Sequence, residues 1–168
     1  MLCTTIIKGD FDMYIPEIPE NSLINEIKEI INLAIRLEGI KRFAFNYPAI
    51  DSQIIEVEKT INYTLPDEYK DFLKFSNGIT LNNFTADFYT TDEIVSTYNV
   101  EKEEPFPEDY IIIADIIGDG EILCFSGRSG KFVMCFGCEE RIFDTFKAFL
   151  KYIIKFIKRL NEEYLLED

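Results

Sequence analysis

Histidine and tryptophan are both absent from this chain of 168 residues. The lack of histidine removes the commonest general base, the usual base of a catalytic triad and the commonest metal ligand. Carboxylates, lysine, tyrosine and cysteine remain, so a small enzyme that works with carboxylates stays open as one hypothesis.

Long uncharged apolar runs are also missing. The start, MLCTTIIKGDFDMY, lacks the basic segment and apolar run of a signal peptide. The C-terminal stretch FKAFLKYIIKFIKRL is interrupted by lysine at helical intervals, which argues against a membrane span. We therefore expect a cytoplasmic protein with reduced cysteines.

Basic residues are scarce: 17 Lys and Arg stand against 31 Asp and Glu, for a formal net charge of −14. A field of this sign repels nucleic-acid phosphates and anionic lipid, so we expect neither nucleic acid nor membrane as a partner. It attracts a basic protein. The alternative is that the acidity serves solubility alone.

Apolar residues make up 47% of the chain and aromatic residues 14%, which predicts a packed globular domain. Helical periodicity predicts helices over residues 21–38, from about 51 and from 66, and a last helix capped by Asp144. Thr91 begins a further helical turn or two. Strands are expected over residues 79–81, 86–88, 110–117, 121–126 and 131–136, and a shorter one near residues 4–7. Helices first, strands in the middle and a closing helix predict a segregated α+β fold with an antiparallel-rich sheet.

The cysteines are Cys3, Cys124, Cys135 and Cys138. A four-thiolate zinc site needs two closely spaced pairs, and only Cys135 and Cys138 form one. Glu139 and Glu140 follow directly and would disfavour thiolates. We therefore expect structural, metal-free cysteines and no cofactor.

Two glycine-rich turns join the expected strands, and the first holds Gly118, Asp119 and Gly120. A phosphate loop would need a lysine and a following helix, so a turn is the better interpretation.

Four acidic residues are candidates for a partner-binding surface: Asp67, Asp71, Asp119 and Glu121. Their positions at a helix start and beside a strand turn predict exposure. The competing interpretation is that they cap a helix dipole and solvate loops. Glu58, close to the Leu65-Pro66 corner, is either a surface residue or a buried carboxylate that accepts backbone N–H groups of that corner.

Residues 50–78 (IDSQIIEVEKTINYTLPDEYKDFLKFSNG) resemble the SUKH superfamily. The resemblance rests on Glu58, Leu65, Pro66, Asn77 and Gly78, together with the aromatic residues of the intervening helix. The later stretch IIIADIIGDGEILCFSGRSGKFVMCF and the FKAFL segment look like that family's sheet and the start of its closing helix. Ala114 and Ser126 stand where the family often has Gly and Asp.

The resemblance covers roughly residues 45 to 155 and implies a single SUKH-like domain over residues 1–168, with residues 1–45 as an arm and helix outside the match. It implies a bacterial immunity protein that binds and neutralises a cognate toxin, often a nuclease, without catalysis. The alternative function is an interaction or regulatory adaptor of the same fold.

Overall fold

The computed structural model describes residues 13–100, 106–116 and 120–166. Its helices are α1 (Ile24–Arg36), α2 (Asp51–Ile61), α3 (Asp67–Phe75), α4 (Thr91–Tyr98), α5 (Phe146–Leu160) and α6 (Glu162–Leu165). Its strands are β1 (Ala44–Phe45), β2 (Ile79–Leu81), β3 (Ala86–Phe88), β4 (Tyr110–Ile116), β5 (Glu121–Ser126), β6 (Phe132–Phe136) and β7 (Glu139–Phe143).

The strands form one antiparallel sheet in chain order, from β1 at one edge to β7 at the other. Each strand therefore pairs with its sequence neighbours, and the register shifts once, between Ile112 and Ala114 of β4. This arrangement confirms the α+β fold with a central antiparallel sheet that the sequence predicts.

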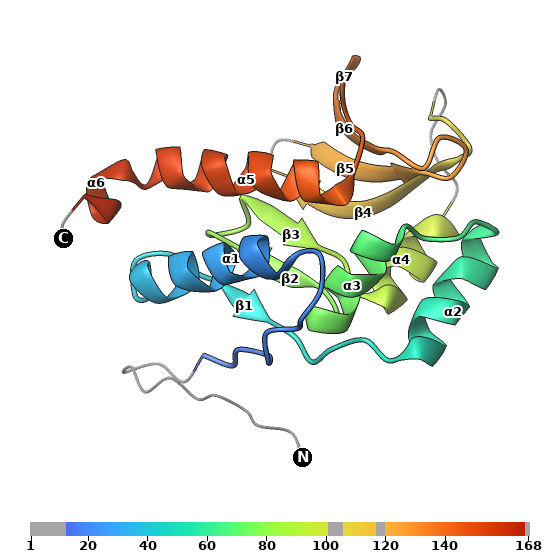
Figure 1. The fold of residues 1–168 in the computed structure, drawn as a ribbon. Helices are drawn as coiled ribbons and strands as arrows, with labels where there is room; N and C mark the ends of the chain where they lie inside the picture. The colour runs from blue at the N-terminus through green and yellow to red at the C-terminus, as the bar shows by residue number, and fades with distance from the viewer. Residues whose placement is uncertain (1–12, 101–105, 117–119, 167–168) are drawn as a thin grey trace.

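The helices pack around this sheet without alternating with its strands (Figure 1). Helix α5 crosses the sheet, with α1 alongside it and α3 near its beginning. Helix α2 packs on α4, and α4 contacts β4. Although α1 and β1 lie within the first 45 residues, their apolar residues Ile27, Ile30 and Phe45 belong to the same buried cluster as the sheet.

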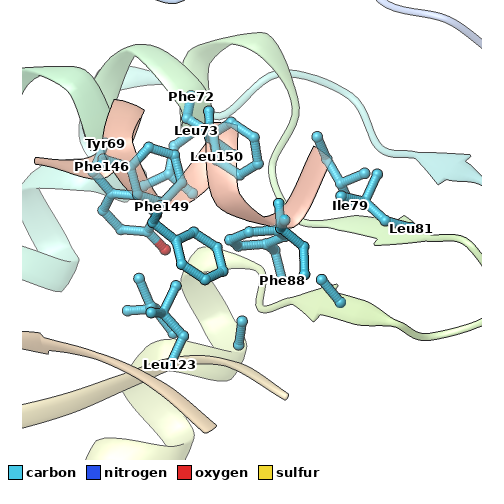
Figure 2. Packing of buried hydrophobic residues seen from close by; sticks show 14 of the residues in the cluster. Tyr69, Phe72, Leu73, Ile79, Leu81, Phe88, Leu123, Phe146, Phe149 and Leu150 are labelled. Atoms are coloured by element: carbon cyan, nitrogen blue, oxygen red, sulfur yellow. The ribbon is translucent and has the colours of Figure 1, made fainter. Parts of the chain in front are cut away.

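Aromatic side chains from α3, β3 and α5 meet at the centre of the core (Figure 2), and Phe132 of β6 packs against them. Phe146 of α5 lies 5.0 Å from Tyr69, 4.8 Å from Phe72 and 5.1 Å from Phe132, measured between ring centroids. Phe72 also meets Phe88 of β3 at 4.9 Å. Phe146 also meets Phe88 of β3 at 6.0 Å. Because this one ring contacts α3, β3 and β6, the cluster fixes the position of α3 and α5 on the sheet.

Two expectations for the last third of the chain are wrong. Thr145, not Asp144, caps α5, since its hydroxyl accepts the N–H of Ala148 at 3.1 Å, while Asp144 pairs with Lys131 at 2.9 Å. Strand β7 was not expected, because its sequence EERIF carries three charges and lacks the apolar alternation of a buried strand. The possible strand at residues 4–7 lies outside the described residues.

Candidate functional site

The corner between α2 and α3 uses Glu58 to satisfy the backbone. Its carboxylate accepts the N–H of Leu65 at 2.9 Å, which is the corner bond that the sequence suggests. Lys70 of α3 reaches the same oxygen at 3.5 Å. Glu58 is half-buried rather than buried, while Leu65 beside it is fully enclosed. Glu58 therefore works chiefly as an internal acceptor of the fold.

Asn77 and Gly78 connect α3 to β2, and the Asn77 side chain also bonds to the first residue of α4. The Asn77 side-chain oxygen accepts the N–H of Thr91 at 2.8 Å, and its amide nitrogen donates to the Thr91 hydroxyl at 3.1 Å. Gly78 has a φ of +85°, and a Cβ there would lie 2.9 Å from the carbonyl oxygen of Phe88. Only glycine fits this position without strain.

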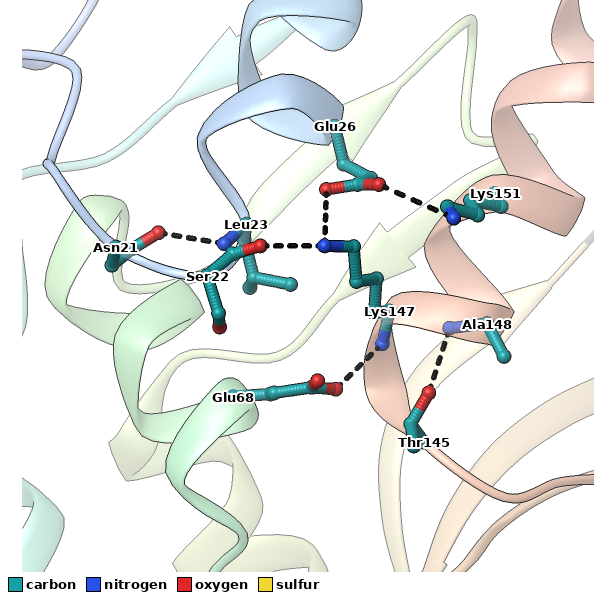
Figure 3. A network of polar contacts seen from close by, with 9 residues as sticks. All are labelled: Asn21, Ser22, Leu23, Glu26, Glu68, Thr145, Lys147, Ala148 and Lys151. Carbon is teal, nitrogen blue, oxygen red and sulfur yellow. Dashed lines mark hydrogen bonds and ion pairs between the residues drawn. The ribbon is translucent and has the colours of Figure 1, made fainter.

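A polar network links α1, α3 and α5 (Figure 3). Glu68 of α3 accepts the backbone N–H of Lys147 at 2.9 Å, in the first turn of α5. The Lys147 ammonium donates to the carbonyl of Ser22 at 2.8 Å and lies 3.8 Å from Glu26, which Lys151 also approaches at 3.9 Å. These charges hold helices together, so they do not form an open binding surface.

The predicted acidic residues of α3 lie at the surface. The Asp67 side chain is 98% exposed and pairs with Lys70 at 3.3 Å. Asp71 is partly buried; burial and the neighbouring Asp67 raise its pKa, and this exceeds the opposite effect of Lys74. A raised pKa means that the folded protein disfavours the Asp71 anion, as expected for like charges one helical turn apart.

The expectation that Glu121 is exposed is wrong, because the residue is only 8% exposed. It begins β5 opposite Ile116 and lines a hollow of about 380 Å³ with Phe136, Tyr152 and Phe156. Its place on the sheet rather than in the turn explains the burial. Asp119 lies outside the described residues.

The four acidic candidates do not form one described surface. Tyr69 of α3 contacts Phe132, which pairs with Phe125 near the end of β5. Glu121 stands four residues before Phe125, about 13 Å away along an extended strand. The α3 acids and Glu121 therefore lie toward different ends of the sheet.

Three cysteines lie among the described residues, and none of the three forms a disulfide there: Cys124 is buried, Cys135 half-buried and Cys138 exposed. The β5–β6 register pairs Cys135 with Ile122 and Cys124 with Val133, so the two cysteines are diagonal neighbours, as the sequence suggests. A hydrogen bond with Cys124 lowers the pKa of Cys135 and outweighs burial and Glu140, which both raise it. The expected effect of Glu140, which is to raise the pKa of the thiol, is therefore present but does not set the net direction of the shift.

The far edge of the sheet carries exposed groups that sequence reasoning missed. Ile142 of β7 is 57% exposed and Phe136, at the end of β6, is 51% exposed. The Tyr110 hydroxyl donates to Glu140 of β7 at 3.3 Å, and burial, then Glu140, raise the pKa of Tyr110 to about 12. The sequence EERIF gave no signal for this edge, because its three charges leave no apolar alternation.

Residues 13–100, 106–116 and 120–166 hold no cluster of three or more side chains suited to a metal ion. Within the same ranges, every helix is too short or too polar to cross a bilayer.

Comparison with known families adds one finding. The family model described as SMI1 / KNR4 family (SUKH-1) matches residues 48–152. The matched range holds the α2–α3 corner, the Asn77-Gly78 junction, the sheet from β2 to β7 and the first half of α5. No curated protein matches the chain.

Proposed function

The chain belongs to the SMI1 / KNR4 family (SUKH-1), and from this membership we propose that it is an immunity protein that binds and neutralises a cognate bacterial toxin. The observation that carries the proposal is the family match over residues 48–152. The net charge of −14 adds a physical reason for a basic partner. A toxic nuclease is such a partner, because its substrate-binding surface must attract phosphates.

We propose that inhibition works by direct contact and without catalysis, inside the cell that makes both proteins. An acidic protein that covers the basic substrate groove of a nuclease competes with nucleic acid for the same charges. Free nucleic acid and anionic membranes are poor partners for the same electrostatic reason.

The test begins with the genes beside this one, where a large secreted protein with a toxic C-terminal domain is expected. That toxic domain is expressed in a sensitive host with and without this protein. Restored growth and a complex of the two purified proteins support the proposal. Growth that stays arrested although the protein accumulates would reject it, and an unrelated toxin of the same activity serves as the control for specificity.

Asp67 and Asp71 remain proposed contributors to partner capture. Electrostatic steering accelerates association, and its range falls from about 30 Å at 0.01 M salt to about 8 Å at 0.15 M. We expect the on-rate for the toxic domain to fall over this salt range and to fall further in Asp67→Asn/Asp71→Asn. The control is Glu162→Gln/Glu163→Gln, which removes two equal charges from α6. An on-rate that changes neither with salt nor with the α3 substitutions would instead indicate an apolar interface.

The second candidate function is an interaction adaptor of the same fold, which the family assignment also accommodates. It predicts a stable complex with a host protein and no rescue from a neighbouring toxin.

A further inference from the structure

We propose that β7 is the docking edge for the partner, and that it accepts an extended, lysine- or arginine-rich segment as an eighth strand of the sheet. The proposal rests on the proposed function for the partner being a protein, and it specifies where and how that protein binds.

Strand β7 ends the sheet, and β6 is its one strand neighbour among the described residues. Figure 1 shows the β6–β7 hairpin rising above α5, away from the other helices. At the opposite edge, β1 has only two residues, so it offers a much shorter template. An accessible edge strand of five residues presents unpaired backbone groups, which is the requirement for strand addition.

The register shows which backbone groups are available. Phe136 and Glu139 flank the two-residue turn of the hairpin, and such a closing pair exchanges two hydrogen bonds. Alternation then directs the N–H and C=O groups of Arg141 toward β6 and those of Glu140 and Ile142 outward. Two residues of β7 therefore present both a donor and an acceptor to an added strand.

The inner face of β7 is already fixed. The Arg141 guanidinium lies over the Tyr152 ring of α5 at 4.9 Å, and Phe143 meets Phe149 and Tyr152 at 5.3 and 5.4 Å between ring centroids. These contacts hold the strand extended before a partner arrives, so little backbone entropy would be lost on docking.

The charges on β7 determine which kind of added strand would bind there most favourably. Glu139 and Glu140 are exposed on β7, and no ion pair between described residues uses either one. Beside them, Phe136 and Ile142 offer apolar contact at 51% and 57% exposure. A second copy would bring the same glutamates and another net charge of −14 to this edge, which repels self-pairing. Successive side chains point to opposite faces of a strand, so Glu140 and Ile142 share the outer face, while Arg141 and Phe143 lie on the inner one. A segment that alternates basic and apolar residues can place its basic side chains beside Glu140 and its apolar side chains beside Phe143, away from the charge of Arg141.

The test uses a synthetic peptide, acetyl-Lys-Val-Lys-Val-Lys-Val-amide, and the full-length protein followed by NMR. We expect the peptide to shift the amide signals of β7 and to slow hydrogen exchange at Glu140 and Ile142. The matching peptide with glutamate in place of lysine should leave these signals unchanged.

Ile142→Pro removes an outward N–H while sparing the pairing with β6, so it should weaken peptide binding at least tenfold. Ile142→Ala loses the side chain but keeps that N–H, and it should bind much closer to wild type. Glu140→Lys should weaken binding severalfold, because it reverses a charge on the edge strand and also removes the acceptor of the Tyr110 hydroxyl.

Three results would overturn the proposal: no response of β7 in the wild-type protein at millimolar peptide, a response confined to α3 around Asp67 and Asp71, or equal binding by Ile142→Pro and Ile142→Ala. Dimerisation of the protein through β7 would also overturn it. A failure here leaves rescue from the toxin untouched, and a failure of rescue leaves the peptide result standing, so the two proposals fail separately.

Discussion

The two ends of the sheet differ in what their polar groups bind. We call one end the anchored end: it comprises the α2–α3 corner, the Asn77-Gly78 segment between α3 and β2, and the β5–β6 turn. There, carboxylates and amides bond to backbone. Glu58 accepts from Leu65, Asn77 bonds Thr91, and Asp109 accepts from Arg128. At the open end, the β6–β7 hairpin, Glu139 and Ile142 are exposed. The residues Glu58 and Asn77, which carry the family resemblance, therefore serve the fold.

The largest expected difference between the two ends concerns apolar side chains. Phe72 is fully buried and contacts three other rings, so Phe72→Ala should destabilise the protein by about 3–5 kcal/mol. Ile142→Ala at the open end should change the free energy of unfolding by less than about 0.5 kcal/mol. Denaturant unfolding of both variants measures the contrast, and equal losses would show that the hairpin is part of the cooperative core.

Glycines give the next contrast. Gly78 and Gly137 both have positive φ, but only Gly78 is crowded, by the Phe88 carbonyl. Gly78→Ala should cost about 2–3 kcal/mol, because the backbone is strained and the neighbour is fixed. Gly137→Ala meets open space and should cost only about 1 kcal/mol. Thermal melts of the pair would refute this interpretation if Gly137→Ala were the less stable one.

Much of the anchored end was predictable from sequence, because its elements follow local rules. Helix α2 begins at Asp51 as expected. Helix α3 begins at Asp67, one residue after the expected start at Pro66, which is its cap residue. Strands β2, β3 and β5 have the expected bounds. These segments combine regular apolar spacing with turn residues at their ends.

The open end was less predictable for a physical reason. Strand β7 exists because β6 supplies its hydrogen bonds and α5 holds Arg141 and Phe143, and neither contact leaves an apolar pattern in EERIF. The burial of Glu121 likewise depends on neighbours that are distant in sequence. Phe136 of β6 and Tyr152 of α5 line the same hollow. Of the predicted acidic residues, the two that are described as exposed or partly exposed, Asp67 and Asp71, sit on a helix whose own periodicity reveals its outer face.

The corner bond should have a moderate effect. Glu58→Ala leaves the N–H of Leu65 without its acceptor, so it should cost about 1–2 kcal/mol. Glu58→Gln keeps a side-chain oxygen in place and should recover most of that loss. Glu140→Ala at the open end should stay within about 0.5 kcal/mol of wild type. A Glu58→Ala protein that melts at the wild-type temperature would show that the bond between Glu58 and Leu65 does not stabilise the fold.

The smallest expected effects separate two carboxylates by the sign of their pH dependence. Burial raises the pKa of Asp109, but bonds from the Ser126 hydroxyl at 2.8 Å and the Arg128 N–H at 3.3 Å outweigh it, so its pKa is lowered overall. A lowered folded pKa adds stability that is present above the ordinary carboxyl range and is lost as the pH falls through the folded value. Asp71 has a raised pKa, so its anion costs stability at neutral pH and the cost disappears as the pH falls through that raised value.

Asp109→Asn should therefore lower the stability at pH 7 by about 1 kcal/mol, and Asp71→Asn should raise it slightly. Both differences from wild type should shrink toward pH 3, as measured by urea unfolding at a series of pH values. If the two variants shift stability in the same direction at pH 7, bonding to the backbone does not distinguish these carboxylates.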